Sequence, residues 1–337
     1  MHRCLALSQR ENQRPTLPAC VTWVLAQQGR ILEEGSFLES QLVRKFERLL
    51  SLDSLTLAPN STLYLSFEPS YSPESIKTIL SLQLSQVIVG GLHPNSEQAG
   101  LFLTALQTTG LKAVRYSPPM AIQQHLLPIY HFHQKKRPYL LLKYAQSQDG
   151  FMGQNDRQIW LTNIFSKRLV HRWRSETNAI LVGTNTALLD NPRLTNRYFA
   201  GKQALRIVLD RNLRLPQHLH IFDDQHPTWI ITAQAAPKHH FKQTQYFQLD
   251  FEQLLPSLLE LLHHHQILHL TVEGGAQLLQ YFIATGYWDE ARIFSSQQQL
   301  KTGIAAPQLQ QSPRHTVQLL SDQLQYYFNE NIGTSAP

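Results

Sequence analysis

The sequence predicts an α/β protein with two domains, and three observations support this class. The chain has 337 residues, of which 42% are hydrophobic, and at about 150 residues per domain this length suits two cores. Strand-like and helix-like segments alternate, which is typical of βαβ units and mostly parallel sheets. The alternation is interrupted by a basic, proline-flanked stretch at 135–138 and then restarts. We therefore expect one domain over 1–135 and a second over 136–337.

Composition excludes several classes of protein. The two cysteines, Cys4 and Cys20, are too few for a disulfide scaffold or a Cys-rich zinc module. The net charge is +6, but the only compact basic run is 135–137, so no nucleic-acid partner is predicted. The start of the chain has no signal-peptide core, and no run of about 18 apolar residues occurs. These features predict a cytoplasmic protein with no membrane partner.

The first domain reads as a complete α/β layer of alternating segments. Its expected strands are 19–26, 61–67, 86–90 and 111–115, and its expected helices are 42–50, 73–82 and 95–109. The second domain repeats the alternation. Its expected strands are 139–143, 179–183, 205–210, 228–232 and 268–272, its expected helices are 163–175, 251–264 and 275–286, and its tail over 289–328 reads as strands that pair antiparallel.

A strand-to-helix turn in the second domain is a candidate ligand site. Glu273 ends a buried strand, and Gly274 and Gly275 follow it at the start of a helix. Two glycines let a backbone approach a ligand, and free N–H groups at a helix start favour a phosphate. Open α/β sheets bind ligands at this edge. A tight turn without a ligand remains the alternative.

Two further segments could carry chemistry. Gly183-Thr-Asn-Thr186 ends a strand and can cap a helix, after which Asp190 and Arg197 flank a loop closed by Pro192. Lys143 ends another strand, where an ammonium group can bind an anion or a carbonyl oxygen. Taken alone, the loop also fits a simple turn, and Lys143 also fits a solvated strand end.

Together these motifs resemble the reductase domain of the riboflavin-biosynthesis deaminase/reductase family. The resemblance covers about 138–307 and runs in the same order through five segments: 138–150, 159–175, 183–197, 206–216 and 272–275. It implies a dihydrofolate-reductase-like fold that binds NADPH. The implied reaction reduces the ribosyl group of a phosphorylated ribosylaminopyrimidine, 5-amino-6-(5-phosphoribosylamino)uracil, to a ribityl chain.

The resemblance also implies roles for individual residues. The implied substrate contacts are Arg174, Leu194, Arg197 and Glu273, and the implied cofactor contacts are Ala145, Trp160, Thr186, Asp190, Gly274 and Gly275. Forked guanidinium groups suit a sugar phosphate. The catalytic candidates are Lys143, Asp190 and Glu273, of which Lys143 would polarise the opened-ring imine or an adjacent oxygen. The family often has Ser where this chain has Gln158.

The first domain resembles the zinc-dependent deaminase half of the same family, which implies a cytidine-deaminase-like three-layer fold. Zinc deaminases need a His or Cys and two further Cys ligands, with a Glu near the first as proton shuttle. Here Ser70 and Ser75 stand where the two Cys ligands belong, and the helix over 41–46 has no His-x-Glu. We therefore expect no zinc and no deaminase activity. The domain would then serve as a dimerisation or stability scaffold of a homodimer.

Three alternatives remain open from the sequence. The enzyme could still be bifunctional, with deamination at a rearranged site, which stoichiometric zinc would indicate. The reductase could act on another pterin or pyrimidine, for which Gln158 is the only support. A non-catalytic regulator or nucleic-acid binder would bind no NADPH.

Overall fold

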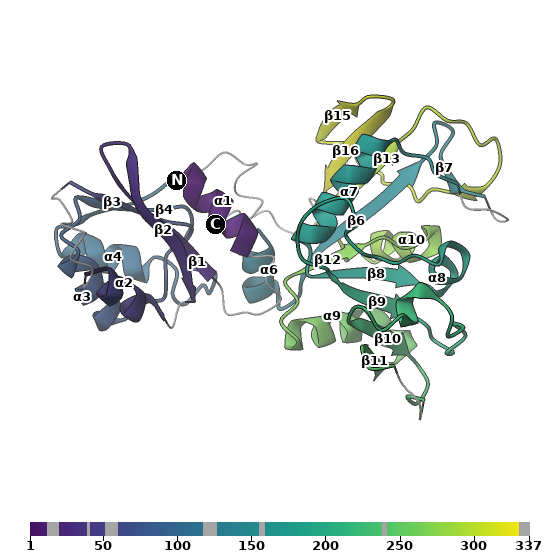
Figure 1. Ribbon diagram of the computed structural model, residues 1–337, viewed down its shortest axis with the longest axis horizontal. Helices are drawn as coiled ribbons and strands as arrows, with labels where there is room; N and C mark the ends of the chain where they lie inside the picture. The colour runs from purple at the N-terminus through teal and green to yellow at the C-terminus, as the bar shows by residue number, and fades with distance from the viewer. Residues whose placement is uncertain are drawn as a thin grey trace. The chain divides into compact units, whose positions relative to one another are not determined.

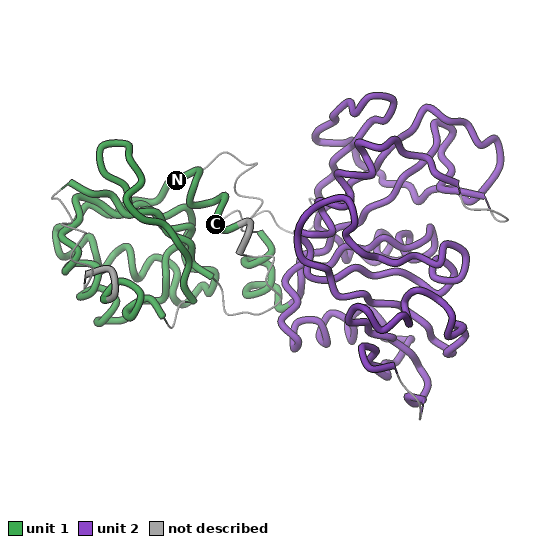
Figure 2. Tube along the Cα trace, viewed as in Figure 1, with its two compact units in different colours: residues 1–136, 336–337 green, residues 137–335 purple. Residues whose placement is uncertain are grey.

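The chain is described here by a computed structural model. It describes residues 1–11, 20–38, 41–50, 60–116, 127–154, 159–237 and 241–329. The chain divides into two compact units, of which unit 1 runs from Met1 to Lys136 and unit 2 begins at Arg137 (Figure 2).

Unit 1 contains a mixed five-stranded sheet in its described residues, with strand order β2-β1-β3-β4-β5 (Figure 1). The strands are β1 (Cys20–Gln27), β2 (Arg30–Leu38), β3 (Thr62–Leu65), β4 (Gln86–Val89) and β5 (Lys112–Arg115). β1 pairs antiparallel with β2 and β3, whereas β3, β4 and β5 are parallel. The turn expected at Gln28 and Gly29, which both have positive φ, makes β2 antiparallel to β1. β1 is also antiparallel to β3, so the sheet is less parallel than predicted.

The helices of unit 1 follow the sequence pattern only in part. They are α1 (His2–Glu11), α2 (Leu42–Leu50), α3 (Pro73–Ser81), α4 (Leu101–Thr108) and α6 (Leu127–Lys135). α3 lies within the predicted 73–82, and its N-cap is Ser72. α4 begins six residues later than the predicted start at 95, because Gly100 has φ of 84° and interrupts the helical path.

Unit 2 contains a nine-stranded sheet in its described residues, with strand order β11-β10-β9-β8-β12-β6-β13-β16-β15. The strands are β6 (Tyr139–Gln146), β8 (Ala179–Gly183), β9 (Leu205–Leu209), β10 (Thr228–Thr232), β11 (Thr244–Gln248), β12 (His269–Val272), β13 (Glu290–Ser295), β15 (His315–Leu319) and β16 (Asp322–Phe328). From β11 to β13 all neighbours are parallel, and β16 and β15 are antiparallel at one edge. The predicted antiparallel tail is therefore correct for β15 and β16, whereas β13 also pairs parallel with β6.

Helices cover both faces of this sheet. On one face α9 (Leu254–His264) and α10 (Ala276–Ala284) bury Leu258 and Phe282 against strand residues such as Leu142. On the other face α7 (Ile164–Glu176) packs Trp173 against Phe294, and α8 (Thr184–Asp190) lies beside β8. No helix in the described ranges is long and apolar enough to cross a membrane.

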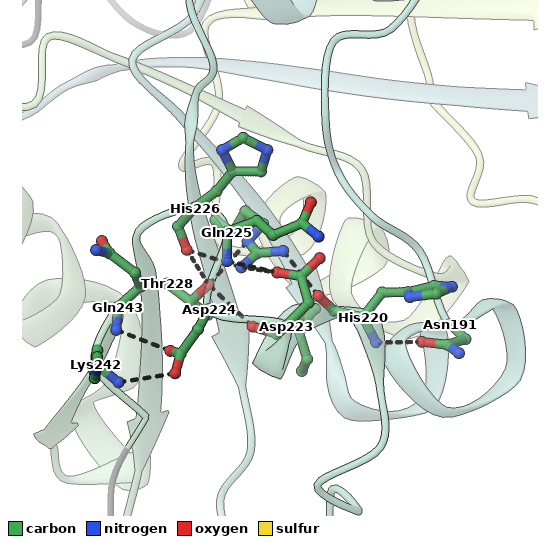
Figure 3. Close-up of polar contacts among 11 residues, drawn as sticks. Asn191, His220, Asp223, Asp224, Gln225, His226, Thr228, Lys242 and Gln243 are labelled. Carbon is green, nitrogen blue, oxygen red and sulfur yellow. Dashed lines mark hydrogen bonds and ion pairs between the residues drawn. The ribbon is translucent and has the colours of Figure 1, made fainter.

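A buried arginine anchors the chain that follows α8. Arg206 is 1% exposed, and its guanidinium donates to the hydroxyl of Thr228, the carbonyl of His220 and the carboxylate of Asp223. The backbone N–H of His220 in turn donates to the side-chain oxygen of Asn191, 2.7 Å away, where α8 ends (Figure 3). This network holds the far end of α8 and leaves its start at the carboxyl edge of the sheet.

Candidate active site

The candidate site lies where β12 of unit 2 ends beside the parallel strand β6. Lys143 was expected at the end of its strand, but β6 continues to Gln146 because residues 143–146 pair with β13. Leu142 of β6 and Val272 of β12 are partners in the register. Lys143 follows Leu142 within β6, and Glu273 directly follows the last residue of β12. The two residues are therefore neighbours with side chains on one face of the sheet. Adjacent carboxyl ends of parallel strands are the usual ligand-binding edge of an α/β sheet.

An ion pair joins this edge to α7. The Arg174 guanidinium donates from Nε to Oε1 of Glu273 at 2.9 Å and from the second terminal nitrogen to Oε2 at 2.7 Å. The two side chains are 14% and 8% exposed. Arg174 also donates to the carbonyl of Thr195, 3.2 Å away. Both charges are thus fixed in orientation, as a bidentate pair requires.

The charges at this edge shift one another's pKa values. Burial alone would raise the pKa of Glu273, but the positive charges of Arg174 and Lys143 lower it to about 2. The pKa of Lys143 is lowered from its ordinary value by burial and by the charge of Arg174, which together outweigh the attraction of Glu273. Lys143 is therefore a better proton donor than an ordinary lysine and is held beside a permanent carboxylate.

A neutral histidine ties the loop after Leu194 to α7. The backbone N–H of Arg197 donates to Nδ1 of His171, 3.0 Å away, so the proton of this imidazole is on Nε2. Burial and the charges of Arg174 and Arg197 lower the pKa of His171 to about 4. His171 is 3% exposed, whereas the Arg197 side chain is exposed. The loop therefore presents Arg197 outward from a fixed backbone.

Leu194, a predicted substrate contact, is a core residue in the structure. Its side chain is 3% exposed and packs in a cluster with Ile180 and Val182 of β8. Its φ is 53°, a left-handed conformation that costs free energy for a leucine. This backbone bend directs the following residues, including the Thr195 carbonyl, back toward Arg174.

The predicted cofactor turn at Gly274 and Gly275 packs closely against Thr186 and Leu278, and we call this turn with Thr186 the glycine cradle. Gly183 and Gly275 are the N-caps of α8 and α10, and neither helix has a side-chain hydrogen bond at its cap. A Cβ added to Gly275 would lie 3.1 Å from the hydroxyl of Thr186. One added to Gly274 would lie 2.6 Å from Leu278. The N-terminus of α10 thus lies against Thr186 with uncapped N–H groups, and these features fit the phosphates of a dinucleotide.

The other predicted cofactor residues are more dispersed. Ala145 is half-buried near the end of β6, and Trp160 is 61% exposed. Asp190 is exposed at the end of α8, where desolvation raises the pKa of its carboxyl group. Gln158 lies outside the described residues. The structure therefore joins Arg174 and Glu273 directly and places Lys143 within reach of their charges. Asp190 has no hydrogen bond or ion pair to these residues in the described ranges.

Sequence reasoning assigned no role to Lys167 or His171. With Arg174 they follow a spacing of four and three residues, which places basic groups on one side of α7. The Lys167 ammonium lies 4.6 Å from the ring centroid of Trp160 and 4.9 Å from that of Tyr198. The spacing alone could have indicated this basic stripe.

In unit 1, the serines at the expected zinc-ligand positions have other partners. The Nδ1 of His93 accepts the Asn95 N–H, so its Nε2–H donates to Ser70 Oγ at 3.1 Å. Ser75 Oγ donates to the carbonyl of Ser72 at 2.7 Å and accepts its N–H at 3.0 Å. Within the described residues no three His, Cys, Asp or Glu side chains could together hold a metal ion. The donor set around Ser70 and Ser75 does not fit zinc, which prefers thiolate and imidazole.

Glu68, the residue before Pro69, also forms hydrogen bonds that serve the structure. Glu68 is fully buried, and its carboxylate accepts the backbone N–H groups of His93, Gly100 and Leu103. It therefore holds the segment that leads into α4 and satisfies donors at the start of that helix.

Unit 2 has the architecture of an α/β reductase domain. At one edge of its sheet lie the Arg174–Glu273 ion pair, here called the clamp, and the Gly274-Gly275 turn. The family described as the RibD C-terminal domain matches residues 138–296. A reductase of Archaeoglobus fulgidus that acts on 2,5-diamino-6-ribosylamino-4(3H)-pyrimidinone 5′-phosphate is 33% identical over 174 residues, which cover 47% of this chain and 80% of that protein. The riboflavin biosynthesis protein RibD of Synechocystis is 28% identical over 319 residues, covering 91% of this chain and 86% of that protein.

Solved structures show the same fold over both units. A deaminase/reductase of Thermotoga maritima superposes with a TM-score of 0.80 at 22% identity, covering 98% of this chain and 97% of that chain. RibD of Acinetobacter baumannii gives 0.79 at 20% identity, covering 97% of each chain. The chain belongs to the riboflavin-biosynthesis deaminase/reductase family, and its mixed α/β class is confirmed. Within that family, unit 2 carries the reductase domain, which has the dihydrofolate-reductase-like fold.

Proposed function

We propose that this protein uses NADPH to reduce the ribosyl group of 5-amino-6-(5-phosphoribosylamino)uracil to the ribityl form. The observation that carries the proposal is the Arg174–Glu273 clamp beside Lys143, next to the Gly274-Gly275 turn. The site offers fixed charge for a polar sugar and a close backbone approach for a phosphate-bearing cofactor. Both are needed to align a ribosyl carbon with a nicotinamide.

Lys143 is proposed as the acid of the reaction. Opening of the ribose ring gives a carbon–nitrogen double bond at the sugar C1, and bound NADPH supplies the hydride that adds to this carbon. The nitrogen then needs one proton, which the Lys143 ammonium can donate. The lowered pKa of Lys143 favours this donation, while Glu273 stabilises the charged form before transfer. Asp190 shares no hydrogen bond or ion pair with this group in the described residues, and we assign it to the cofactor.

The remaining residues are proposed to hold the two ligands. Arg174, Arg197 and Glu273 would bind the substrate, and Leu194 would shape the loop between them from the core. Ala145, Trp160, Thr186, Gly274 and Gly275 would contact NADPH, and the cradle between Thr186 and Gly275 supports this assignment.

A direct assay tests the reductase proposal. NADPH oxidation is measured separately with the aminated and the deaminated ribosylaminopyrimidine phosphate. We expect turnover of the deaminated compound and a loss of at least 100-fold for Glu273→Gln. An enzyme that oxidises NADPH with neither pyrimidine would contradict the proposal.

The archaeal relative supports a second candidate substrate. That protein, 33% identical to this chain, is named for reduction of a 2,5-diamino pyrimidine, which still carries the amino group. If this chain does the same, reduction precedes deamination and the aminated substrate is turned over faster. The two-substrate assay distinguishes these orders.

We further propose that unit 1 has no zinc-dependent deaminase activity. The hydroxyls of Ser70 and Ser75 already have hydrogen-bond partners, and neither is a thiolate. Metal analysis and a deamination assay on the purified full chain test this, and stoichiometric zinc with deamination would contradict it. A homodimer, a scaffold role for unit 1 and a cytoplasmic location remain predictions.

A further inference from the structure

A polar cavity lies along β13, further toward the carboxyl end of the sheet than Lys143. Its volume is about 340 Å³, which is in the usual range for a small-molecule site. Residues 161–163 before and at the start of α7, 296–298 after β13, and 321–322 at the start of β16 line it. None of the residues proposed for the reaction is among them, so the cavity has no role yet.

One carboxylate of this cavity is buried without a cation. Asp322 is 1% exposed, and its Oδ2 accepts short hydrogen bonds from the Asn163 N–H at 2.8 Å and the Ser166 hydroxyl at 2.6 Å. In the described residues its Oδ1 accepts only from the Ser321 hydroxyl, at 3.3 Å, and no Lys, Arg or His forms an ion pair with Asp322. A buried carboxylate oxygen with one long contact favours a further donor.

A hydroxyl with an unused donor lines the same cavity. Ser296 is 5% exposed, and its Oγ accepts the Gln298 N–H at 3.3 Å, but no group in the described ranges accepts its own O–H. The Gln298 side chain donates to the carbonyls of Trp160 and Leu161, which fixes the loop after β13 against the segment before α7. The cavity therefore offers one acceptor and one donor on a wall that hydrogen bonds hold in place.

The strand register relates this cavity to Lys143. β6 and β13 are parallel, with Lys143 opposite Arg292 and Ala145 opposite Phe294, so these residues and Ser296 share one face of the sheet. The Lys143 ammonium lies 5.9 Å from the centroid of the Phe294 ring, and its side chain therefore leans toward the carboxyl ends of the strands. Ser296 is two residues beyond Phe294, or about 7 Å along the strand. This separation matches the width of a pyrimidine ring.

The donor and acceptor groups select the class of ligand. A metal ion does not fit, because no three His, Cys, Asp or Glu side chains in the described parts of the chain could hold one. A carboxylate accepts from the amino and ring N–H groups of a base, and a hydroxyl can donate to a carbonyl oxygen. An amino-substituted heterocycle with a neighbouring carbonyl therefore fits both Asp322 and Ser296.

We propose that this cavity binds the amino-substituted edge of the substrate's pyrimidine ring, with Asp322 accepting from N–H groups and Ser296 donating to a ring carbonyl. This inference rests on the proposed reduction of a ribosylaminopyrimidine. Both candidate substrates carry an amino group at C5 and a carbonyl at C4, so the inference holds for either order of reduction and deamination. Asp322 and Ser296 then determine specificity for the base, while the clamp and Lys143 act on the sugar.

Exchange of the acceptor for a donor tests this assignment in the kinetics. Asp322→Asn keeps one oxygen for the Asn163 N–H and the Ser166 hydroxyl and turns an amide N–H toward the cavity. We expect KM for the pyrimidine substrate to rise about 10-fold to 100-fold, with KM for NADPH and kcat within about 3-fold. Ser166→Ala is the matched control, because it removes a bond to the same carboxylate from outside the cavity, and it should leave all three constants within about 3-fold.

A binding experiment keeps this inference distinguishable from the proposed reaction. Ligand-detected NMR on the full chain compares 5,6-diaminouracil, which has the amino groups but neither ribose nor phosphate, with uracil, which has no amino group. We expect 5,6-diaminouracil to bind at least about 10-fold more tightly than uracil, and Asp322→Asn but not Ser166→Ala to remove this preference. Ser296→Ala breaks no hydrogen bond of α7, so it keeps the test decisive if Asp322→Asn lowers stability, and it should weaken 5,6-diaminouracil binding about 3-fold to 10-fold.

The outcomes separate the cavity from the reaction. If the full chain reduces no pyrimidine but shows this binding pattern, the reaction is wrong and the base-binding cavity stands. If it reduces the pyrimidine but binds 5,6-diaminouracil no better than uracil, the cavity assignment is overturned and the reaction stands. A preference that survives in both Asp322→Asn and Ser296→Ala would likewise overturn the assignment.

Discussion

Arg174 and Glu273, 99 residues apart in the chain, are joined by two hydrogen bonds of 2.9 and 2.7 Å. The pair links α7 to the end of β12 and is largely shielded from solvent. Its geometry fixes a carboxylate beside Lys143, so stability and chemistry at this edge depend on the same contact.

Removal of the arginine should be costly. Arg174→Gln leaves the Glu273 carboxylate buried without its partner, and we expect a loss of about 3–5 kcal/mol in the free energy of unfolding. Urea denaturation measures this. The matched control is Arg172→Gln on the same helix, because Arg172 pairs with Glu176 at a more exposed position and should cost less than about 0.5 kcal/mol. Similar losses of unfolding free energy for the two variants would show that the buried pair stabilises the fold no more than the exposed one.

The neutral state of His171 predicts a pH dependence of stability. The pKa of His171 is about 4 in the folded protein, against an ordinary 6.5. Between these values the unfolded chain binds a proton that the folded protein does not, so stability falls as pH decreases from about 6.5 to about 4. His171→Asn can still accept the Arg197 N–H but does not titrate. The free energy of unfolding of this variant, relative to that of the unaltered protein, should therefore increase as pH falls from about 6.5 to about 4. A difference that does not change with pH would contradict the prediction.

Lys143 should control the alkaline limit of activity. Its ammonium is present below its folded pKa and is lost as pH rises through that value, which lies below that of an ordinary lysine. We expect Lys143→Gln to lower kcat by about 100-fold or more and to abolish this alkaline limb of the kcat profile. NADPH affinity, measured by fluorescence titration, should stay within about 3-fold. A variant that keeps the limb would assign it to another group.

The glycine cradle can be tested by adding a single methyl group. Gly275→Ala would place a Cβ 3.1 Å from the Thr186 hydroxyl, at a φ of −67° that alanine adopts without strain. We expect at least 10-fold weaker NADPH binding with little loss of stability, because the backbone can no longer approach the phosphates as closely. Gly153→Ala is the control, since its Cβ would meet nothing within 4 Å. Unchanged NADPH affinity in Gly275→Ala would remove the cradle from the cofactor site.

The sequence was most informative where local patterns decide the structure. Pro73 after Ser72 predicts the start of α3, and the alternation of strands and helices predicts the α/β class. Even so, local patterns did not predict α1 or the parallel pairing of β13 with β6. The first is a mostly polar segment, and the second depends on which strands meet across long sequence separations.

The residues of the candidate site could be predicted from the sequence, but the contacts between them could not. Glu273 and Arg174 were both expected at the site, but nothing in the sequence shows that they bind each other. Leu194 stays a predicted substrate contact, but its positive φ and the burial of its side chain in the core were not predicted. Lys167 was given no role because its contacts with the rings of Trp160 and Tyr198 exist only after folding.

The capping box of α3 bears on the proposed absence of zinc from unit 1. Ser72 and Ser75 exchange hydrogen bonds at the helix start, and Ser75 is 3% exposed. A cysteine at 75 would supply a thiol but remove its half of this exchange, at a cost of about 1 kcal/mol. No first histidine ligand would yet be in place to compensate. The single step Ser75→Cys therefore begins with a less stable protein, which would make the proposed absence of the zinc site hard to reverse one residue at a time.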